Sequence, residues 1–266
     1  METINVITCV DKKFEKYAKN LKEICAKLTH IHLWVYDIGP QEEQLDVADF
    51  KLFATDNYSR KDKNNHIIAN HKPIIIKHFL TEKKANCLCI DADCIFTGDL
   101  APSLFEQVDI GVTPRALREQ KAAILRNGLI NTGFLYFSYS QEMLAFLDRW
   151  AEACADGGVS DQKALSDILE TQIDLVDGDN SQRFDGFNVF KFDPDVYNDV
   201  TCKTGKIFHC KSVARRKSKY RAYCVLSTMM KLCPHFCDAL ISFNRKHRLL
   251  VYRRKKNEVY QKRLEG

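Results

Sequence analysis

Residues 87–96 read CLCIDADCIF, an apolar segment interrupted by Asp91 and Asp93. The apolar residues predict a buried strand. An unpaired carboxylate is costly to bury, and two like charges one residue apart cost more. A divalent cation relieves both charges, and oxygen ligands suit Mg²⁺ or Mn²⁺, which keep open positions for substrate phosphates. The segment therefore predicts metal-assisted chemistry on a phosphorylated donor. The alternative is a solvated pair on a loop, because Asp-x-Asp is a common sequence.

The chain before this segment alternates between strand and helix patterns. Strands are predicted at residues 3–10, 31–36 and 50–53. Helices are predicted at residues 14–28, 41–49 and 72–80. This order predicts an α/β fold, a sheet with helices on both faces, in which ligands bind at the carboxyl ends of the strands. Asp91 and Asp93 lie at such an end.

The same alternation continues after residue 96. Further strands are expected at residues 108–112, 129–138 and 206–210, the second with a polar break in its middle. Ser140 is predicted to cap a helix that runs through Trp150, and Ser160 is predicted to cap a second helix that ends at Ile168. From about residue 213 the pattern is helical.

Composition limits the class of protein. A chain of 266 residues with 45% hydrophobic residues forms one large α/β domain or two small ones. No apolar stretch of about 18 residues predicts a transmembrane helix, and the N-terminus lacks the pattern of a secretory signal. Eleven cysteines, most of them in apolar runs, indicate reduced, buried thiols in a cytoplasmic protein. Cys233, His235 and Cys237 lack the further ligands that a structural zinc site needs.

Charge is unevenly distributed along the chain. From Lys211 to the end there are 16 Lys and Arg against 3 Asp and Glu, whereas the whole chain carries +5. Residues 1–210 are therefore acidic and the C-terminal region is strongly basic. Such a region attracts a phospholipid surface, a nucleic acid or an anionic glycan; the alternative is a solvated helical face.

Several sequence elements, taken in order, resemble one enzyme family. They are the first strand, Lys72-Pro73, Asp91-Ala92-Asp93, Asn131-Thr132-Gly133, Ser160-Asp161-Gln162 with Leu165, and His209 with Lys211. Together they resemble nucleotide-sugar glycosyltransferases of the GT-A fold, and are most similar to the retaining group that contains glycogenin and lipopolysaccharide galactosyltransferases. The resemblance implies a Rossmann-like mixed central sheet flanked by helices. It also implies a catalytic domain over residues 1–212 and a basic helical region over 213–266 that contacts the acceptor, a membrane or a polyanion.

The resemblance assigns a metal site to three residues. Asp91 and Asp93, the DxD motif, would bind Mn²⁺ or Mg²⁺ together with His209. The cation would bridge the diphosphate of the donor and neutralise the leaving group. Taken alone, His209 reads as a core histidine at the end of a strand.

The resemblance also assigns the donor-sugar site. Asn131 and Gly133 would line the sugar, Asp161 would accept hydrogen bonds from its hydroxyls, and Gln162 would lie near the anomeric carbon. Asp161 and Gln162 are thus the catalytic candidates. The alternatives are a turn or bulge within a strand for Asn131 and Gly133, and two ordinary polar residues in the first turn of a helix for Asp161 and Gln162.

Further donor contacts follow from the same resemblance. Lys211 and Lys72 would approach the phosphates, and Ala92 with Asp91 would border the donor. Thr8 and Val10, at the end of the first strand, would face the base. The family pattern usually has a glycine after the histidine–lysine segment, whereas this chain has Ser212, so Arg215 or Arg216 could replace Lys211.

The resulting prediction is a metal-dependent hexosyltransferase of polysaccharide biosynthesis. It moves a sugar from a nucleotide diphosphate sugar, preferentially a UDP-sugar, to a glycan, lipopolysaccharide or other acceptor with retention, in the cytoplasm and peripherally at the inner membrane face. The alternatives are transfer to nucleic acid or modified bases, and a non-catalytic nucleotide-sugar-binding module. A nucleotidyltransferase is disfavoured because residues 10–13 contain no glycine for a phosphate loop. The sugar, acceptor and linkage are open.

Overall fold

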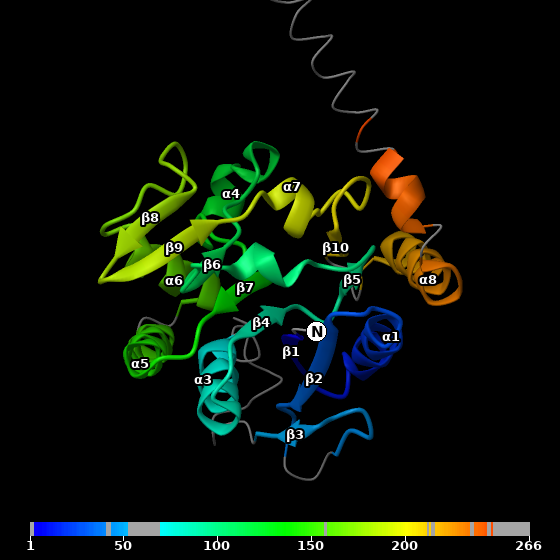
Figure 1. Cartoon of the computed structure of the whole chain (residues 1–266), viewed down its shortest axis with the longest axis horizontal. Coiled ribbons are helices and arrows are strands. Elements are labelled where there is room, and N and C mark those ends of the chain that lie inside the picture. The colour runs from blue at the N-terminus through cyan, green and yellow to red at the C-terminus, as the bar shows by residue number, and fades with distance from the viewer. Residues whose placement is uncertain are drawn as a thin grey trace, which may run out of the picture.

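A mixed eight-stranded sheet forms the centre of the molecule in the computed structural model (Figure 1). The structure describes residues 3–40, 44–52, 70–156, 159–211, 213, 216–234, 237–243 and 246. The strand order in the sheet is β3-β2-β1-β4-β7-β6-β9-β8, and a separate two-stranded sheet pairs β10 with β5. The strands are β1 (Ile4–Val10), β2 (Ile31–Asp37), β3 (Phe50–Lys51), β4 (Cys87–Ile90), β5 (Cys94–Phe96), β6 (Ile110–Val112), β7 (Phe134–Phe137), β8 (Ser181–Phe184), β9 (Phe187–Lys191) and β10 (Ile207–His209).

Helices cover both faces of this sheet. They are α1 (Glu15–Cys25), α3 (Lys72–Lys83), η1 (Pro102–Phe105), η2 (Leu117–Glu119), α4 (Ala122–Leu125), α5 (Gln141–Asp156), α6 (Asp161–Leu169), α7 (Pro194–Tyr197) and α8 (Lys217–Leu232). Alternate side chains of β1 point to opposite faces. Val6 therefore packs in the cluster that includes Tyr17 of α1, whereas Ile7 packs in the cluster that includes Phe79 of α3 and Trp150 of α5. The predicted α/β fold with helices on both faces is confirmed.

The order of the strands explains where polar residues gather. β1 pairs in parallel with both β2 and β4. The connection through α1 leads to one side of β1, and the connection through α3 leads to the other. The carboxyl ends of the strands at such a change of direction are the usual ligand position in sheets of this kind. In this chain that position lies directly beyond Ile90, where Asp91 begins a turn.

Two strand pairings bring distant segments to this turn. β4 runs antiparallel to β7 with Ile90 opposite Phe134, which sets Gly133 beside Asp91. β5 runs antiparallel to β10 with Cys94 opposite His209. The backbone N–H of Cys210 donates to the carbonyl oxygen of Asp93 at 3.1 Å. Residues more than 100 positions apart in the sequence therefore meet at one turn.

One expectation about local structure is wrong, and one strand is shorter than expected. Residues 44–49 form turns instead of a helix, because two carboxylates connect this segment to β2. The Asp37 carboxylate of β2 accepts from the backbone N–H of Leu45, and the Asp49 carboxylate accepts from the backbone N–H of Val35 in β2. Residues 41–43 lie outside the described part. The strand expected at 129–138 is confined to Phe134–Phe137. The β8–β9 hairpin and α7 were not predicted, since β8 is short, polar and largely exposed.

Helix α8 packs against α1 at the edge of the molecule (Figure 1). The rings of Tyr223 and Tyr17 lie edge to face with centroids 5.1 Å apart, and Lys231 forms an ion pair with Glu23 at 3.0 Å. Among the described residues, no single helix has the length and apolarity to cross a membrane. A sharply bent pair, Lys217–Leu232 with Cys237–Phe243, meets those two criteria only when taken together.

Candidate active site

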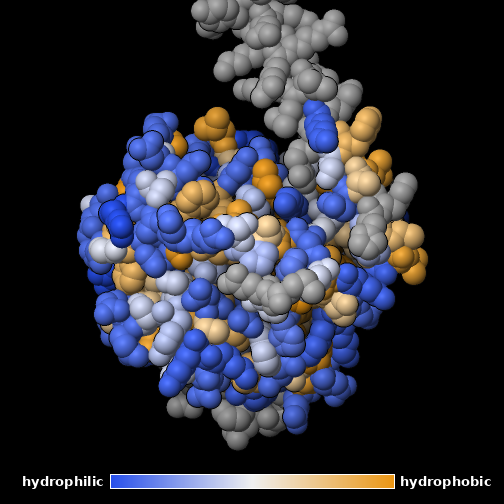
Figure 2. All heavy atoms as spheres, in the orientation of Figure 1, coloured by the Kyte–Doolittle hydropathy of each residue, from blue (hydrophilic) through white to orange (hydrophobic). Residues whose placement is uncertain are grey.

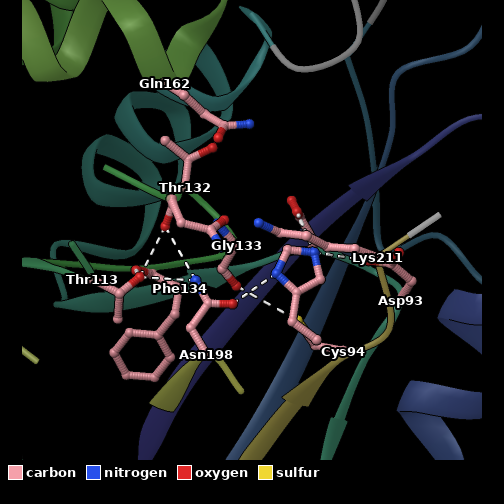
Figure 3. Close-up of polar contacts among 12 residues, drawn as sticks. Asp93, Cys94, Thr113, Thr132, Gly133, Phe134, Gln162, Asn198 and Lys211 are labelled. Carbon is pink, nitrogen blue, oxygen red and sulfur yellow. Dashed lines mark hydrogen bonds and ion pairs between the residues drawn. The ribbon is translucent and has the colours of Figure 1, made fainter. Parts of the chain in front are cut away.

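Asp91, Asp93 and His209 converge at the turn between β4 and β5. The Nε2 atom of His209 lies 3.2 Å from Oδ2 of Asp91 and 3.5 Å from Oδ1 of Asp93. The imidazole is only 4% exposed, whereas the Asp91 side chain is 30% exposed, so the cluster opens to solvent on the side of Asp91. In Figure 3, Asp93 and Lys211 lie on one side of the view, and Gly133 and Asn198 lie on the other.

This donor set fits a divalent cation. Neighbouring ligand atoms of an octahedral ion with bonds of about 2.1 Å lie about 3 Å apart, close to the separations between His209 and the two carboxylates. The ligand atoms of Asp93, Cys94 and His209 all lie within 4.8 Å of one another. The Cys94 thiol donates to the carbonyl oxygen of Gly133 at 3.6 Å, and burial raises its pKa well above the ordinary value. Cys94 is therefore a neutral thiol, and the charged donors are Asp91 and Asp93.

The two aspartates differ in their electrostatic surroundings. Burial alone would raise the pKa of Asp91, but the Lys72 charge and the contacts with His209 outweigh it and hold that pKa well below its usual range. For Asp93, burial raises the pKa, and the negative charge of Asp91 adds to the increase against the opposing effect of His209. Asp91 is thus compensated by protein groups. Asp93 is the carboxylate that a cation would stabilise most.

Lys72 is buried at the start of α3 and links this cluster to α6. Its Nζ lies 2.7 Å from Oδ1 of Asp91 and 3.4 Å from Oδ2 of Asp161, and it donates to the carbonyl and hydroxyl oxygens of Thr132, each at 3.0 Å. Burial would lower the pKa of Lys72, but the charges of Asp91 and Asp161 raise it well above the ordinary value. Lys72, which the sequence predicts to approach the phosphates, is therefore already ion-paired with Asp91 and Asp161.

Asp161 and Asn131 each present a buried polar atom that has no hydrogen-bond partner among the residues that the structure describes. Ser160 caps α6, as predicted, by accepting from the backbone N–H of Lys163. Asp161 accepts at Oδ2 from the Thr132 hydroxyl at 2.5 Å, whereas its buried Oδ1 has no partner in the described part of the chain. Asn131 accepts at Oδ1 from the N–H of Gly133 at 3.2 Å, and no described residue pairs with its buried Nδ2. Buried polar atoms are usually paired, so these two indicate a polar ligand.

Gly133 has no room for a side chain. A Cβ atom built there would overlap Nδ1 and Cε1 of the His209 ring and lie 3.1 Å from Oδ1 of Asn198. The glycine therefore allows the imidazole to pack directly on the backbone, next to Asp91.

Arg115, which the sequence did not reveal, positions Gln162. Its Nε donates to the carbonyl oxygen of Gly128 at 2.8 Å, and its Nη2 donates to Oε1 of Gln162 at 2.5 Å. Because a guanidinium can only donate, the Gln162 oxygen is engaged and its amide NH₂ remains available. No spacing rule connects residues 115 and 162, so sequence reasoning offered no signal for this contact.

Lys211 is held by Glu119, a second residue that the sequence did not reveal. The Nζ of Lys211 lies 2.8 Å from Oε1 of Glu119, and Nη1 of Arg115 lies 3.9 Å from the same oxygen. Burial lowers the pKa of Lys211, and Glu119 opposes that effect. Arg216 is the N-cap residue of α8, and Arg215 lies outside the described part.

The remaining predicted donor contacts are buried. Thr8 is fully buried, and its hydroxyl has no partner within the described ranges. Val10 belongs to the apolar cluster beneath α1. Ala92 is also buried. Burial raises the pKa of the neighbouring Cys9 thiol to about 12. The charge of Lys72 opposes this increase, and the charges of Asp91 and Asp161 add to it. The nucleotide contacts of Thr8, Val10 and Ala92 stay predictions.

Comparison with known proteins agrees with this architecture. Residues 22–209 match the family model of nucleotide-diphospho-sugar transferases. No curated protein matches the chain. The solved structures that share its fold include two glycosyltransferases. One is a glycosyltransferase involved in the glycosylation of the major capsid of PBCV-1, with a TM-score of 0.50 and 11% identity over 83% of this chain and 99% of that chain.

The other structure is the galactosyltransferase LgtC in complex with donor and acceptor sugar analogues. It has a TM-score of 0.56 and 14% identity over 87% of this chain and 98% of that chain. These identities support the fold alone, whereas the family model covers most of the chain. The protein therefore belongs to the nucleotide-diphospho-sugar transferase family and is a glycosyltransferase with a GT-A fold.

Proposed function

We propose that the protein is a metal-dependent glycosyltransferase that uses a nucleotide diphosphate sugar, with a UDP-sugar as the expected donor. The observation that carries this proposal is the convergence of Asp91, Asp93 and His209 at the turn after β4, in a chain of the nucleotide-diphospho-sugar transferase family. Asp91, Asp93 and His209 would hold Mn²⁺ or Mg²⁺. When bound, the ion would supply positive charge to the diphosphate and stabilise the leaving group.

The chain's own residues would bind and orient the donor. Asp161 Oδ1 and Asn131 Nδ2, an acceptor and a donor that pair with none of the described residues, would bind hydroxyls of the sugar. Lys211 would exchange its contact with Glu119 for one with phosphate, which places a positive charge where negative charge develops. Gln162 would present its amide NH₂ to the donor, because Arg115 engages its oxygen. A neutral amide beside the reacting carbon is consistent with a retaining transfer to a glycan or lipopolysaccharide acceptor.

A donor screen tests this proposal. Thermal stability and hydrolysis would be measured with UDP-, GDP-, ADP- and CMP-linked sugars, each with Mn²⁺, Mg²⁺ or EDTA. A ligand at 100 times its Kd stabilises a folded protein by about 2.7 kcal/mol. We expect one donor, UDP-linked, to give a metal-dependent shift and slow hydrolysis. Donor binding without hydrolysis, with or without acceptor, would favour a non-catalytic module, and equal shifts in EDTA would refute metal dependence.

We also propose that the basic region over residues 213–266, whose helix α8 packs on α1, contacts an anionic membrane surface. Large apolar side chains are exposed on α8 and on the helix after it, with Leu232 74% and Phe243 68% exposed. Figure 2 shows apolar residues gathered on this edge of the molecule. The same helix α8 also carries basic residues, including Lys217 and Arg221. Apolar burial combined with attraction to anionic headgroups is the usual basis of peripheral binding.

Vesicle co-sedimentation tests this contact. The protein should bind vesicles rich in phosphatidylserine at low salt and lose binding on Leu232→Asp/Phe243→Asp, because the variant removes the apolar side chains that would enter the headgroup region and adds negative charge. Val176→Asp is the matched control, because Val176 is also exposed but lies away from α8. The absence of any binding to anionic vesicles at low salt would refute the proposal.

A further inference from the structure

Asn198, at the end of α7, contacts the side of His209 that faces away from the carboxylates. Its Oδ1 lies 2.7 Å from Nδ1 of the imidazole. Both side chains are almost completely buried, Asn198 at 1% and His209 at 3% exposure. Figure 3 shows the Asn198 amide between the imidazole and Thr113. Nothing in the sequence pattern marked this residue.

The neighbours of Asn198 determine the orientation of its amide. On the other side, its nitrogen lies 2.9 Å from the Thr113 hydroxyl and 3.3 Å from the carbonyl oxygen of Asn131. The Thr113 hydroxyl itself donates to the Asn131 carbonyl oxygen at 2.9 Å. That hydroxyl can therefore only accept from Asn198, and the carbonyl can accept only. Both contacts require the NH₂ group on this side, so the oxygen faces His209.

This orientation has a direct consequence for the histidine. Since Asn198 Oδ1 can only accept, Nδ1 of His209 must carry the proton that it donates. Nε2, which lies 3.2 Å from Asp91 and 3.5 Å from Asp93, is then the nitrogen whose lone pair is available to a cation. A hydrogen bond to the outer nitrogen is the usual way in which proteins orient a ligating imidazole.

We propose that Asn198 is the positioning residue of the cation site: through its contact with Nδ1 it fixes the tautomer and the plane of His209, so that Nε2 faces Asp91 and Asp93. This inference deepens the proposed function and rests on it. Asn198 also connects the cation site to the proposed sugar site, because it contacts the backbone of Asn131, whose side-chain Nδ2 pairs with no described residue.

The surrounding backbone holds Asn198 in place. Asp199, the next residue, is buried, and its carboxylate accepts from the backbone N–H groups of Thr201 and Gly205 at 2.7 and 3.1 Å. The carbonyl oxygen of Asp199 accepts from the N–H of His209 at 3.0 Å. The chain thus turns back on itself between residues 199 and 207, which places Asn198 beside the histidine that follows it by 11 positions.

The test compares Mn²⁺ affinity across three variants of the full chain in the presence of UDP. Asn198→Ala should weaken Mn²⁺ binding by about 10- to 100-fold, the usual effect of losing such a partner. Asn198→Asp retains an oxygen that accepts from Nδ1 and should recover most of the affinity. Thr97→Val is the control: the buried Thr97 hydroxyl donates to the carbonyls of Gly205 and Lys206 in the same turn but does not contact His209. It should lower stability without changing Mn²⁺ affinity.

A second readout separates positioning from a purely structural role. In long-range ¹H–¹⁵N correlation spectra of the protein with UDP in EDTA, taken at alkaline pH where the imidazole is neutral, His209 should appear as the Nδ1-protonated tautomer, and in Asn198→Ala as a mixture of tautomers. UDP affinity in EDTA should be the same for both proteins. The His209 signal is identified by its loss in His209→Gln.

The outcomes distinguish this inference from the proposed function. If the wild type binds Mn²⁺ and Asp93→Asn does not, while Asn198→Ala binds Mn²⁺ as tightly as the wild type, the role of Asn198 is refuted and the cation site stands. A wild-type protein that binds no Mn²⁺ overturns the proposed function itself. If Asn198→Ala fails to fold, the inference is tested with the other two proteins. A wild-type Mn²⁺ affinity in Asn198→Asp, together with an Nδ1-protonated His209 in the wild-type protein, supports the inference. An Nε2-protonated His209 in the wild-type protein overturns it.

Discussion

Replacing Asp93 with asparagine should abolish metal-dependent transfer and, at the same time, make the metal-free protein more stable. The loss of activity follows from the removal of a charged ligand. A cation that stabilises a leaving group contributes several kcal/mol, so we expect turnover to fall by about 10³-fold or more. Measured kcat/KM with the donor found in the screen, in Mn²⁺ and in EDTA, checks this part.

The gain in stability follows from the electrostatics of the metal-free site. Burial and the charge of Asp91 raise the pKa of Asp93, so the folded state holds that proton more tightly than the unfolded chain. The stability of the metal-free protein therefore falls as pH rises from the ordinary value of 3.8 through the raised pKa. Asp93→Asn removes this dependence and should stabilise the metal-free protein at pH 7 by about 0.5–1 kcal/mol.

Denaturant titrations in EDTA between pH 4 and 8 measure this second effect. Asp195→Asn is the control, because Asp195 is an exposed carboxylate outside the cluster. If Asp93→Asn keeps metal-dependent turnover, or loses stability in EDTA more than the control does, Asp93 is not an uncompensated ligand of a cation.

Replacing Lys72 with methionine should cause the largest loss of stability of any single substitution in this site. The change leaves Asp91 and the fully buried Asp161 without the cation that now lies 2.7 and 3.4 Å from their oxygens. Removing one partner of a buried charge pair costs about 3–5 kcal/mol, because the other charge remains buried and uncompensated. Mn²⁺ with UDP should restore part of this loss by compensating Asp91.

Lys77→Met is the matched control for this prediction. Lys77 lies on the same helix and pairs with Asp148, but both side chains are exposed, and such pairs contribute about 0–1 kcal/mol. The two variants would be compared by chemical denaturation with and without Mn²⁺ and UDP. Equal destabilisation of the two proteins, or no recovery with Mn²⁺, would contradict the electrostatic description of the site.

The sequence predicted those parts of the protein that depend on local pattern. The apolar run that ends at Asp91, the N-caps Ser140 and Ser160 and the final core strand before His209 all follow from neighbouring residues, and the structure contains each of them. The resemblance named Asp91, Asp93 and His209 together, and the structure brings them into contact. Their role as metal ligands stays a prediction.

Contacts between distant segments could not be predicted in this way. Three residues of the site lie in short or irregular segments, and each matters because of a partner elsewhere in the chain. Arg115 contacts Gln162, 47 positions away; Glu119 contacts Lys211, 92 positions away; and Asn198 contacts His209, 11 positions away. The expected helix over residues 41–49 failed for a related reason. Its helical pattern is overridden by the carboxylates of Asp37 and Asp49, which bind backbone N–H groups and hold the segment against β2.

The position of a bound metal tests the central claim most directly. Anomalous diffraction at the manganese edge, from crystals grown with Mn²⁺ and UDP, locates the ion without reference to activity. The account predicts one strong peak in contact with Asp91, Asp93 and Nε2 of His209, next to the diphosphate. A diphosphate bound at the end of β4 with no peak among these three residues would contradict it.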